Sequence, residues 1–335
     1  MRRSCLALFS GGLDSILACK ILQDQGIEVK AIKCISPFFS YNLKDKERAD
    51  LYKEEIRHKY GIDLEVVDIT SEYLSMVASP PHGYGRYLNP CIDCKILMVK
   101  KALSLLDAFN ASFIITGEVL GQRPMSQRRD TLRVIERDSG ADGILLRPLS
   151  ARFLKETIPE VRGAVDRRRL LRIIGRARKE QMRLARHFGI EDYPAPAGGC
   201  VLADPILSKR FSRIFSQWPD YGPEECVLAQ VGRHFLLPYG GWLVVGRNKA
   251  ENEILSRLAS SKDLILKAVE CPGPFCILRA KDESDIRLAA AICARYAKDK
   301  TLPKKIAIYS SVGIPEKTTL VETVPNDELI HSFMF

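Results

Sequence analysis

Strand-like and helix-like segments alternate along the first third of the chain. Four runs have the length and composition of strands: Cys5–Phe9, Glu28–Ser36, Leu64–Thr70 and Ser112–Glu118. Amphipathic helical segments separate them, at residues 13–25, 44–61 and 92–109. Strands that alternate with helices predict an α/β fold with a doubly wound parallel sheet, in which ligands bind at the carboxyl ends of the strands.

A second pattern begins after residue 208. Short strand-like runs and one helix predict a smaller α+β domain. We therefore expect an α/β domain at residues 1–208, a linker at 209–226, an α+β domain at 227–312 and a poorly ordered tail at 313–335. The N-terminal apolar run is interrupted by glycines too early for a secretion signal, and no apolar stretch reaches the ~18 residues that span a bilayer. We expect a cytoplasmic protein with no membrane partner.

The formal net charge of +10 favours a polyanionic partner. Arginine is concentrated at residues 122–140 and 161–189, and its planar donor fork suits phosphate groups. A solvated helix face is the plainer explanation of such a stretch. The arginines that we expect to contact RNA are Arg128, Arg129, Arg167, Arg168 and Arg169.

The turn SGGLDS directly follows the first strand and opens the first helix. Gly11 and Gly12 permit positive φ and the close approach of a ligand. The backbone N–H groups of the turn and of the helix N-terminus form a site for an anion. Ser10 and Ser15 add hydroxyl donors, and Asp14 is placed to hold Mg²⁺ between phosphate oxygens. The string is neither a Walker A loop nor a dinucleotide-binding turn.

This turn resembles the PP-loop of the N-type ATP pyrophosphatases, whose pattern SGGxDS it matches in full. The resemblance implies an adenine nucleotide α-hydrolase-like (HUP) fold, with ATP and Mg²⁺ as cofactors. It also implies cleavage of ATP between the α and β phosphates, with the departing pyrophosphate held by residues 10–15, Leu13 included.

The string ITGEVLGQRPMSQ follows the fourth strand. It resembles the corresponding segment of the 4-thiouridine synthase branch of that superfamily. The resemblance implies nucleotide contacts from Thr116, Gly117 and Gln122. It also brings Glu118 and Gln127, together with Gln122, toward the reacting centre.

Three of the ten cysteines are set apart by their positions. Cys91 and Cys94 form a CxxC pair at the start of a helix, where the helix N-terminus is expected to lower the thiol pKa, and Cys200 follows two glycines. The CxxC pair alone fits a redox dithiol or half of a zinc site. A resemblance to 4Fe–4S-dependent tRNA thiolases implies that all three cysteines bind a cluster and leave one iron open. A resemblance to the 2-thiouridylases implies instead a metal-free catalytic pair, Cys94 with Cys200, and purely structural roles are the third possibility.

The strings GRNKAENEIL and PGP lie near the C-terminus. In this order they resemble the RNA-binding (NFACT-R) domain of the NFACT family, from about Gly232 to Ser310. The resemblance implies RNA contacts from Arg247 and Asn248. The chain departs from that pattern at Lys267, where the family often has histidine.

Together, these motifs predict an ATP-dependent RNA sulfurtransferase with tRNA as the favoured substrate. A uridine carbonyl is adenylated, pyrophosphate is released, and sulfur from a sulfide or persulfide donor replaces the oxygen. In this mechanism Asp14, Cys94 and Cys200 are the catalytic residues. Two alternatives remain: an enzyme that adenylates an acceptor other than RNA, and a non-catalytic RNA-binding protein.

Overall fold

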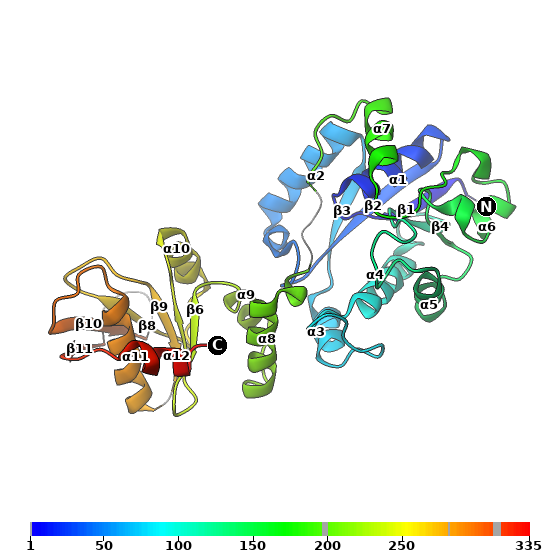
Figure 1. The fold of residues 1–335 in the computed structure, drawn as a ribbon. Helices are drawn as coiled ribbons and strands as arrows, with labels where there is room; N and C mark the ends of the chain where they lie inside the picture. The colour runs from blue at the N-terminus through cyan, green and yellow to red at the C-terminus, as the bar shows by residue number, and fades with distance from the viewer. Residues whose placement is uncertain (1, 196–199, 281, 311–315) are drawn as a thin grey trace. The chain divides into compact units, whose positions relative to one another are not determined.

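The chain folds into two compact units, Met1–Asp204 and Pro205–Phe335 (Figure 1). The structure is a computed structural model that describes residues 2–195, 200–280, 282–310 and 316–335. Within those ranges no helix is both long enough and apolar enough to cross a membrane.

The first unit is built on a five-stranded parallel sheet with the order β3-β2-β1-β4-β5. Its strands are β1 (Ser4–Leu8), β2 (Glu28–Ile35), β3 (Asp63–Asp68), β4 (Phe113–Thr116) and β5 (Leu145–Leu146). This confirms the predicted doubly wound parallel sheet. The strand order reverses between β1 and β4, because β2 and β3 are added on one side of β1 and β4 and β5 on the other. A sheet of this type binds its ligands at the carboxyl ends of the strands beside such a switch point.

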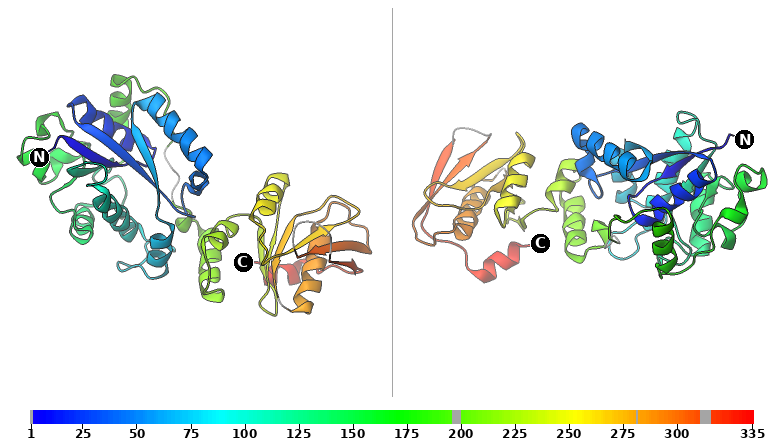
Figure 2. Two further views of the ribbon diagram at one scale, coloured as in Figure 1. Left: turned by 180° about the vertical axis from the view of Figure 1, so that it is seen from behind. Right: turned by 90° about the horizontal axis from the view of Figure 1, so that it is seen from above.

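Helices cover both faces of this sheet (Figure 2). One face carries α1 (Leu13–Asp24), α2 (Lys46–Tyr60) and α7 (Lys179–His187). The other carries α4 (Cys91–Leu105) and α5 (Arg129–Ser139). The part of this unit that the structure describes also contains the α-helices α3 (Thr70–Ala78) and α6 (Ile158–Val161) and several short 3-10 helices. The ends of α2 follow local signals, because Asp45 accepts a hydrogen bond from the Arg48 N–H and Gly61 adopts φ +63° at the C-cap.

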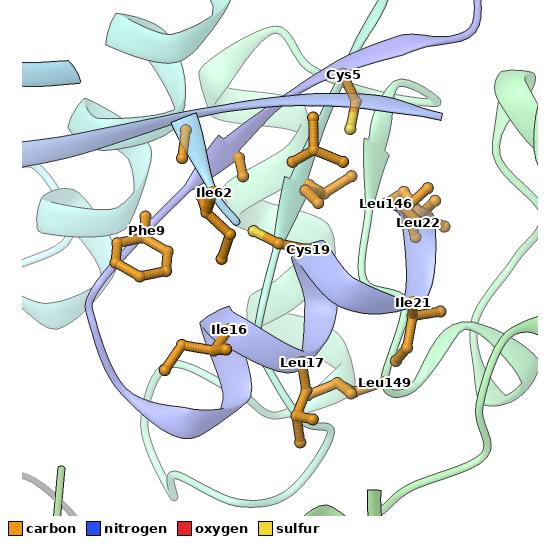
Figure 3. Packing of buried hydrophobic residues seen from close by; sticks show 14 of the residues in the cluster. Cys5, Phe9, Ile16, Leu17, Cys19, Ile21, Leu22, Ile62, Leu146 and Leu149 are labelled. Carbon is orange, nitrogen blue, oxygen red and sulfur yellow. The ribbon is translucent and has the colours of Figure 1, made fainter. Parts of the chain in front are cut away.

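The core of the first unit centres on α1 (Figure 3). Ile16 and Leu17 of α1 are fully buried between the sheet and the loops that follow β4 and β5. Cys5 and Cys19 pack in the same layer as small apolar side chains, and burial raises the pKa of Cys19 to about 12. This packing fixes the direction of α1, so its N-terminus is held at the carboxyl edge of the sheet.

The second unit contains a six-stranded sheet with the order β11-β10-β8-β9-β7-β6, in which all paired neighbours are antiparallel. Its strands are β6 (Arg233–Leu236), β7 (Trp242–Val245), β8 (Leu264–Ala268), β9 (Cys276–Arg279), β10 (Lys304–Tyr309) and β11 (Lys317–Val321). Helix α11 (Glu283–Tyr296) packs on one face and closes a second hydrophobic core. The predicted α+β domain is therefore confirmed.

The segment expected to connect the two domains, 209–226, lies in α8 (Pro205–Gln217) and the beginning of α9 (Pro223–Leu228), and both helices belong to the second unit. The prediction of a poorly ordered tail is wrong. The segment expected to be a disordered tail contains β11, which pairs with β10, and α12 (Asp327–Phe333). Ile330 is 2% exposed in the second core, and Phe333, three residues later, packs against the same core. This helical spacing was the signal in the tail that the prediction overlooked.

The last residues also pair with the edge strand β6. Phe235 and Met334 form an antiparallel bridge, and the N–H of Phe335 donates to the carbonyl of His234. The end of the chain is therefore part of the folded second unit.

Helix α10 (Lys249–Leu258) follows β7, and its N-cap is Asn248, whose side chain accepts a hydrogen bond from the N–H of Glu251.

We expect Ile330→Ala to destabilise the second unit by about 2–5 kcal/mol, because the substitution leaves a cavity in a closed core. Both tryptophans of the chain, Trp218 and Trp242, belong to this unit, so their fluorescence during urea unfolding reports its stability. The matched control is Leu329→Ala, at a neighbouring position that is 45% exposed, which should change the stability by less than about 0.5 kcal/mol. Equal stability of both variants would show that α12 does not contribute to the core.

Candidate nucleotide and thiol site

The turn Ser10–Ser15, called the PP-loop below, connects the carboxyl end of β1 to α1. Gly11 has φ +85°, which L side chains rarely adopt, and Gly12 is the N-cap of α1. The Ser15 hydroxyl donates to the Gly12 carbonyl at 2.7 Å, and the Ser10 oxygen accepts from the Gly12 N–H at 3.2 Å. These contacts hold a short, open turn at the positive end of a helix dipole, which is suited to an anionic group.

The segment after β4 packs directly on the PP-loop. A Cβ atom on Gly117 would lie 2.5 Å from backbone atoms of Asp14 and Ser15, so only glycine fits there. The amide of Gln122 donates to one oxygen of Asp14 at 3.0 Å. The structure therefore brings together two motifs that are a hundred residues apart in the sequence. Gln127 lies elsewhere: it is buried and accepts from the Arg123 N–H, which closes its own loop.

Asp14 has one carboxylate oxygen left over. Its Oδ1 atom is buried and has no hydrogen-bond partner among the described residues, whereas Oδ2 is held by Gln122. Magnesium at nucleotide sites is bound by one or two carboxylates together with phosphate oxygens and water. A single orphaned carboxylate oxygen beside an anion site has the chemistry that this metal needs, so the residues present fit Mg²⁺.

Glu118 is the centre of a buried charge network that the sequence did not reveal. Its Oε2 atom accepts from Arg147 Nε at 3.0 Å and from the Thr116 hydroxyl at 3.1 Å. Its Oε1 atom lies 3.8 Å from Lys95 Nζ, and Arg147 also pairs with Glu136. Burial raises the pKa of Glu118, but Lys95 and Arg147 outweigh burial and hold the pKa below its usual value. The carboxylate therefore stays charged and ties β4 to α4 and to the residue after β5.

The three singled-out cysteines lie close enough to influence one another. The thiol of Cys94 interacts electrostatically with Cys91 and with Cys200, and its sulfur is hydrogen-bonded to the hydroxyl of Tyr73. The two glycines before Cys200 lie outside the described residues. Cys94 is next in sequence to Lys95, whose ammonium lies 3.8 Å from Glu118 Oε1. The positive charge of Arg123, the residue after Gln122, acts to lower the pKa of Cys200. The thiols are thus linked, through Lys95 and through Arg123, to residues of the loop that contacts the PP-loop.

The expected lowering of the thiol pKa at the start of α4 is wrong for Cys94. Removal from water raises its pKa to about 12 and also raises the pKa of Cys200. Desolvation outweighs both the helix N-terminus and the ammonium of Lys95, because the sulfur is enclosed by protein atoms, Tyr73 among them. Both thiols are therefore protonated at neutral pH.

The thiols of Cys91, Cys94 and Cys200 have the chemistry of cluster ligands. All three cysteines are free, they interact with one another, and thiolates are the usual ligands of iron–sulfur clusters. Among the described residues, no group of three or more His, Cys, Asp or Glu side chains has the arrangement of a metal site. The donor set therefore fits a cluster by its chemistry.

The arginines expected to contact RNA in the first unit have protein partners. Arg167 pairs with Glu160 and donates to two backbone carbonyls, so it supports its own loop. The remaining four lie near the surface, where Arg128 pairs with Asp130, Arg129 donates to the Phe153 carbonyl, Arg168 pairs with Asp166 and Arg169 pairs with Asp24. Exposed ion pairs of this kind are weak, so they leave arginine able to exchange partners.

Arg247 and Asn248 of the second unit are both used at the beginning of α10. Arg247 forms a bidentate contact with Glu251, and Asn248 caps the helix. A different residue is more conspicuous: the exposed ammonium of Lys267 lies 4.7 Å from the ring centroid of Phe275 and 5.8 Å from that of Tyr309. The departure of the sequence at Lys267 was the signal that could have drawn attention to it.

Comparison with protein families divides the chain in the same way as the fold. Residues 2–166 match the family model described as thiamine biosynthesis protein (ThiI). Residues 232–334 match the model described as NFACT protein RNA binding domain, which includes the segment that had been expected to be a tail.

Two curated relatives each match less than half of the chain. A probable tRNA sulfurtransferase of Thermococcus kodakarensis is 26% identical over 144 residues, covering 43% of this chain and 36% of that protein. The tRNA-specific 2-thiouridylase MnmA 3 of Phocaeicola vulgatus is 27% identical over 137 residues, covering 38% and 36%. The chain therefore spans about a third of the length of these relatives.

Among solved structures, a 4-thiouridine synthetase–RNA complex with bound ATP has 19% identity and a TM-score of 0.35, covering 56% of this chain and 51% of that one. The two family matches fall in the two units of the fold, and the first includes the PP-loop. Residues 2–166 thus form a domain of the ThiI family, and residues 232–334 of the same chain form an NFACT-type RNA-binding domain.

Proposed function

We propose that this protein is an ATP-dependent sulfurtransferase that acts on tRNA. The observation that carries the proposal is the juxtaposition at the carboxyl edge of the first sheet. The PP-loop contacts the segment that contains Gly117 and Gln122. The same segment carries Glu118, which pairs with Lys95 beside Cys94, and Arg123, whose charge acts on Cys200. An activating site and a sulfur-handling site therefore share one short segment. The names of the curated relatives support the same reaction class.

The first chemical step is activation of a uridine carbonyl. The carbonyl oxygen attacks the α-phosphorus of ATP, the bond from that phosphorus to the oxygen bridging the α and β phosphates breaks, and pyrophosphate leaves. The N-terminus of α1 and the PP-loop N–H groups face the charge that develops on the leaving group. Asp14 would hold Mg²⁺ through its unpartnered oxygen, and the metal would neutralise phosphate charge.

The second step replaces oxygen by sulfur. A sulfur nucleophile from the donor attacks the activated carbon, and AMP departs with the original oxygen. Cys91, Cys94 and Cys200 would hold a 4Fe–4S cluster, which when bound supplies an open iron position for sulfide. Glu118 pairs with Lys95, the neighbour of Cys94 in α4, and this ion pair would help to keep the thiols in position relative to the nucleotide.

The second unit supplies a surface for RNA. Lys267 and Tyr309 lie on adjacent antiparallel strands, β8 and β10, and point to the face opposite α11. On the same face Val269 is 55% exposed and Leu320 of β11 is 52% exposed. An aromatic ring, a lysine and open apolar surface on a sheet suit a base that stacks beside a phosphate contact. Arg128 and Arg168 of the first unit are further phosphate contacts in this proposal.

Asp14→Asn should reduce formation of AMP and pyrophosphate from ATP by at least about 100-fold, because the metal-binding charge beside the leaving group is lost. The assay contains Mg²⁺, sulfide and an unmodified tRNA transcript. Asp24→Asn is the matched control, since Asp24 ends the same helix and pairs with the exposed Arg169. Unchanged AMP formation in Asp14→Asn would contradict the proposed role of the PP-loop.

Anaerobically prepared wild-type protein should contain iron and acid-labile sulfide, and Cys91→Ala should lose most of both. Cys271→Ser is the control, because Cys271 is also partly exposed but belongs to the second unit. Iron-free wild-type protein that still thiolates tRNA would reject the cluster and favour a persulfide on Cys94 or Cys200.

Lys267→Glu should weaken binding of the tRNA transcript about tenfold at low salt and reduce the slope of log affinity against log salt by about 1 to 2. The control is Arg287→Glu on α11, which makes the same charge change on the helix that covers the opposite face of the sheet. Equal salt slopes for the two variants would place the RNA surface elsewhere.

A further inference from the structure

Lys33 is a buried cation beside the PP-loop. It lies near the end of β2, is 8% exposed, and points to the same side of the sheet as α1 and α2. Its Nζ atom donates to the carbonyl of Ser10 at 2.8 Å and lies 5.2 Å from the ring centroid of Tyr52. The lysine is hard to notice in the sequence because a second lysine, Lys30, lies three residues earlier in the same strand and is partly exposed.

Among the described residues, no carboxylate lies within 4.0 Å of the Lys33 ammonium, and its only hydrogen bond is to Ser10. Lys30 of the same strand shows the contrast, because it pairs with Asp63 at 2.6 Å. Burial lowers the pKa of Lys33 to about 8, so Lys33 is still protonated in most molecules at neutral pH. A buried charge without a counter-charge is costly, and an anion that binds beside it relieves this cost.

The position of the ammonium indicates where such an anion would bind. A Cβ atom on Gly11 would lie 3.6 Å from Lys33 Nζ and 2.8 Å from the Tyr52 hydroxyl. Both groups therefore face the backbone of the PP-loop at its first glycine. Desolvation raises the pKa of Tyr52 to about 12, so its hydroxyl remains a donor at neutral pH. A cation and a neutral O–H donor meet the N–H groups of the turn at one place.

We propose that Lys33 binds the pyrophosphate half of ATP, with the Tyr52 hydroxyl as a second donor. This inference rests on the proposed function, because it names the residue that recognises the leaving group at the same site. The ammonium has two N–H donors beyond the one used on Ser10, and a phosphate oxygen provides both the acceptor and the missing negative charge. The adenosine half of the nucleotide does not depend on this contact.

The test compares three ligands on the full-length protein: magnesium pyrophosphate, magnesium ATP and AMP, each titrated by calorimetry. Lys33→Met keeps the length of the side chain and removes the charge. We expect affinity for pyrophosphate and ATP to fall about tenfold to a hundredfold, as for loss of a charge-assisted hydrogen bond, while AMP binding stays unchanged. Tyr52→Phe should have a smaller effect in the same direction.

Two further variants separate binding from folding. Lys30→Met removes an ion-paired lysine of the same strand and should leave all three affinities unchanged. Lys33→Arg keeps the charge and should recover part of the lost pyrophosphate affinity. The melting temperature of ligand-free Lys33→Met should be equal to or above that of the wild type, because an uncompensated buried charge is gone.

Three results would overturn the inference. Equal pyrophosphate affinity in Lys33→Met and the wild type would show that the ammonium does not contact the anion. A lower melting temperature together with weaker binding of all three ligands, AMP included, would show that Lys33 is a structural residue. If the wild-type protein binds neither ATP nor pyrophosphate, the proposed function fails as well. If the wild type binds ATP and Lys33→Met binds it with the same affinity, the proposed function stands without this contact.

Discussion

The close approach of Gly117 to the first turn of α1 is the constraint on which the candidate site depends. There is no space for a side chain at this position, since a Cβ atom would come within 2.5 Å of the backbone of Asp14 and Ser15. The end of β4 and the start of α1 therefore pack backbone against backbone. With that spacing fixed, Gln122 reaches Asp14, and two other residues of the same loop, Glu118 and Arg123, interact with Lys95 beside Cys94 and with Cys200.

The charge network around Glu118 fixes the other side of this loop. Arg147 is 1% exposed and holds both Glu118 and Glu136, so a residue from the end of β5 is tied to β4 and α5. Buried ion pairs contribute little net stability, because desolvation offsets much of their attraction. Their effect here is on orientation, since Glu118 also faces Lys95, the neighbour of Cys94. The Glu118 carboxylate thus connects Lys95, the neighbour of Cys94, to the loop that contacts the PP-loop.

The architecture of both units could be predicted from the sequence, whereas several contacts within the site could not. Alternating strands and helices predicted the parallel sheet, and the string SGGLDS marked the turn at its centre, because both signals are local. Lys33, Arg147 and Tyr73 gave no local signal, since each matters only through a neighbour brought to it by the fold. The thiol pKa of Cys94 was predicted in the wrong direction for the same reason: a helix N-terminus can be read from the sequence, but enclosure by other segments cannot.

The pairing of the last residues with β6 has a consequence for how the protein can be handled. A strand at the edge of a sheet exposes unpaired N–H and C=O groups, on which a strand of another molecule can assemble. Met334 and Phe335 occupy part of that edge by bridging to Phe235 and His234. Truncation before α12, or a bulky fusion directly after Phe335, would uncover the strand and promote self-association.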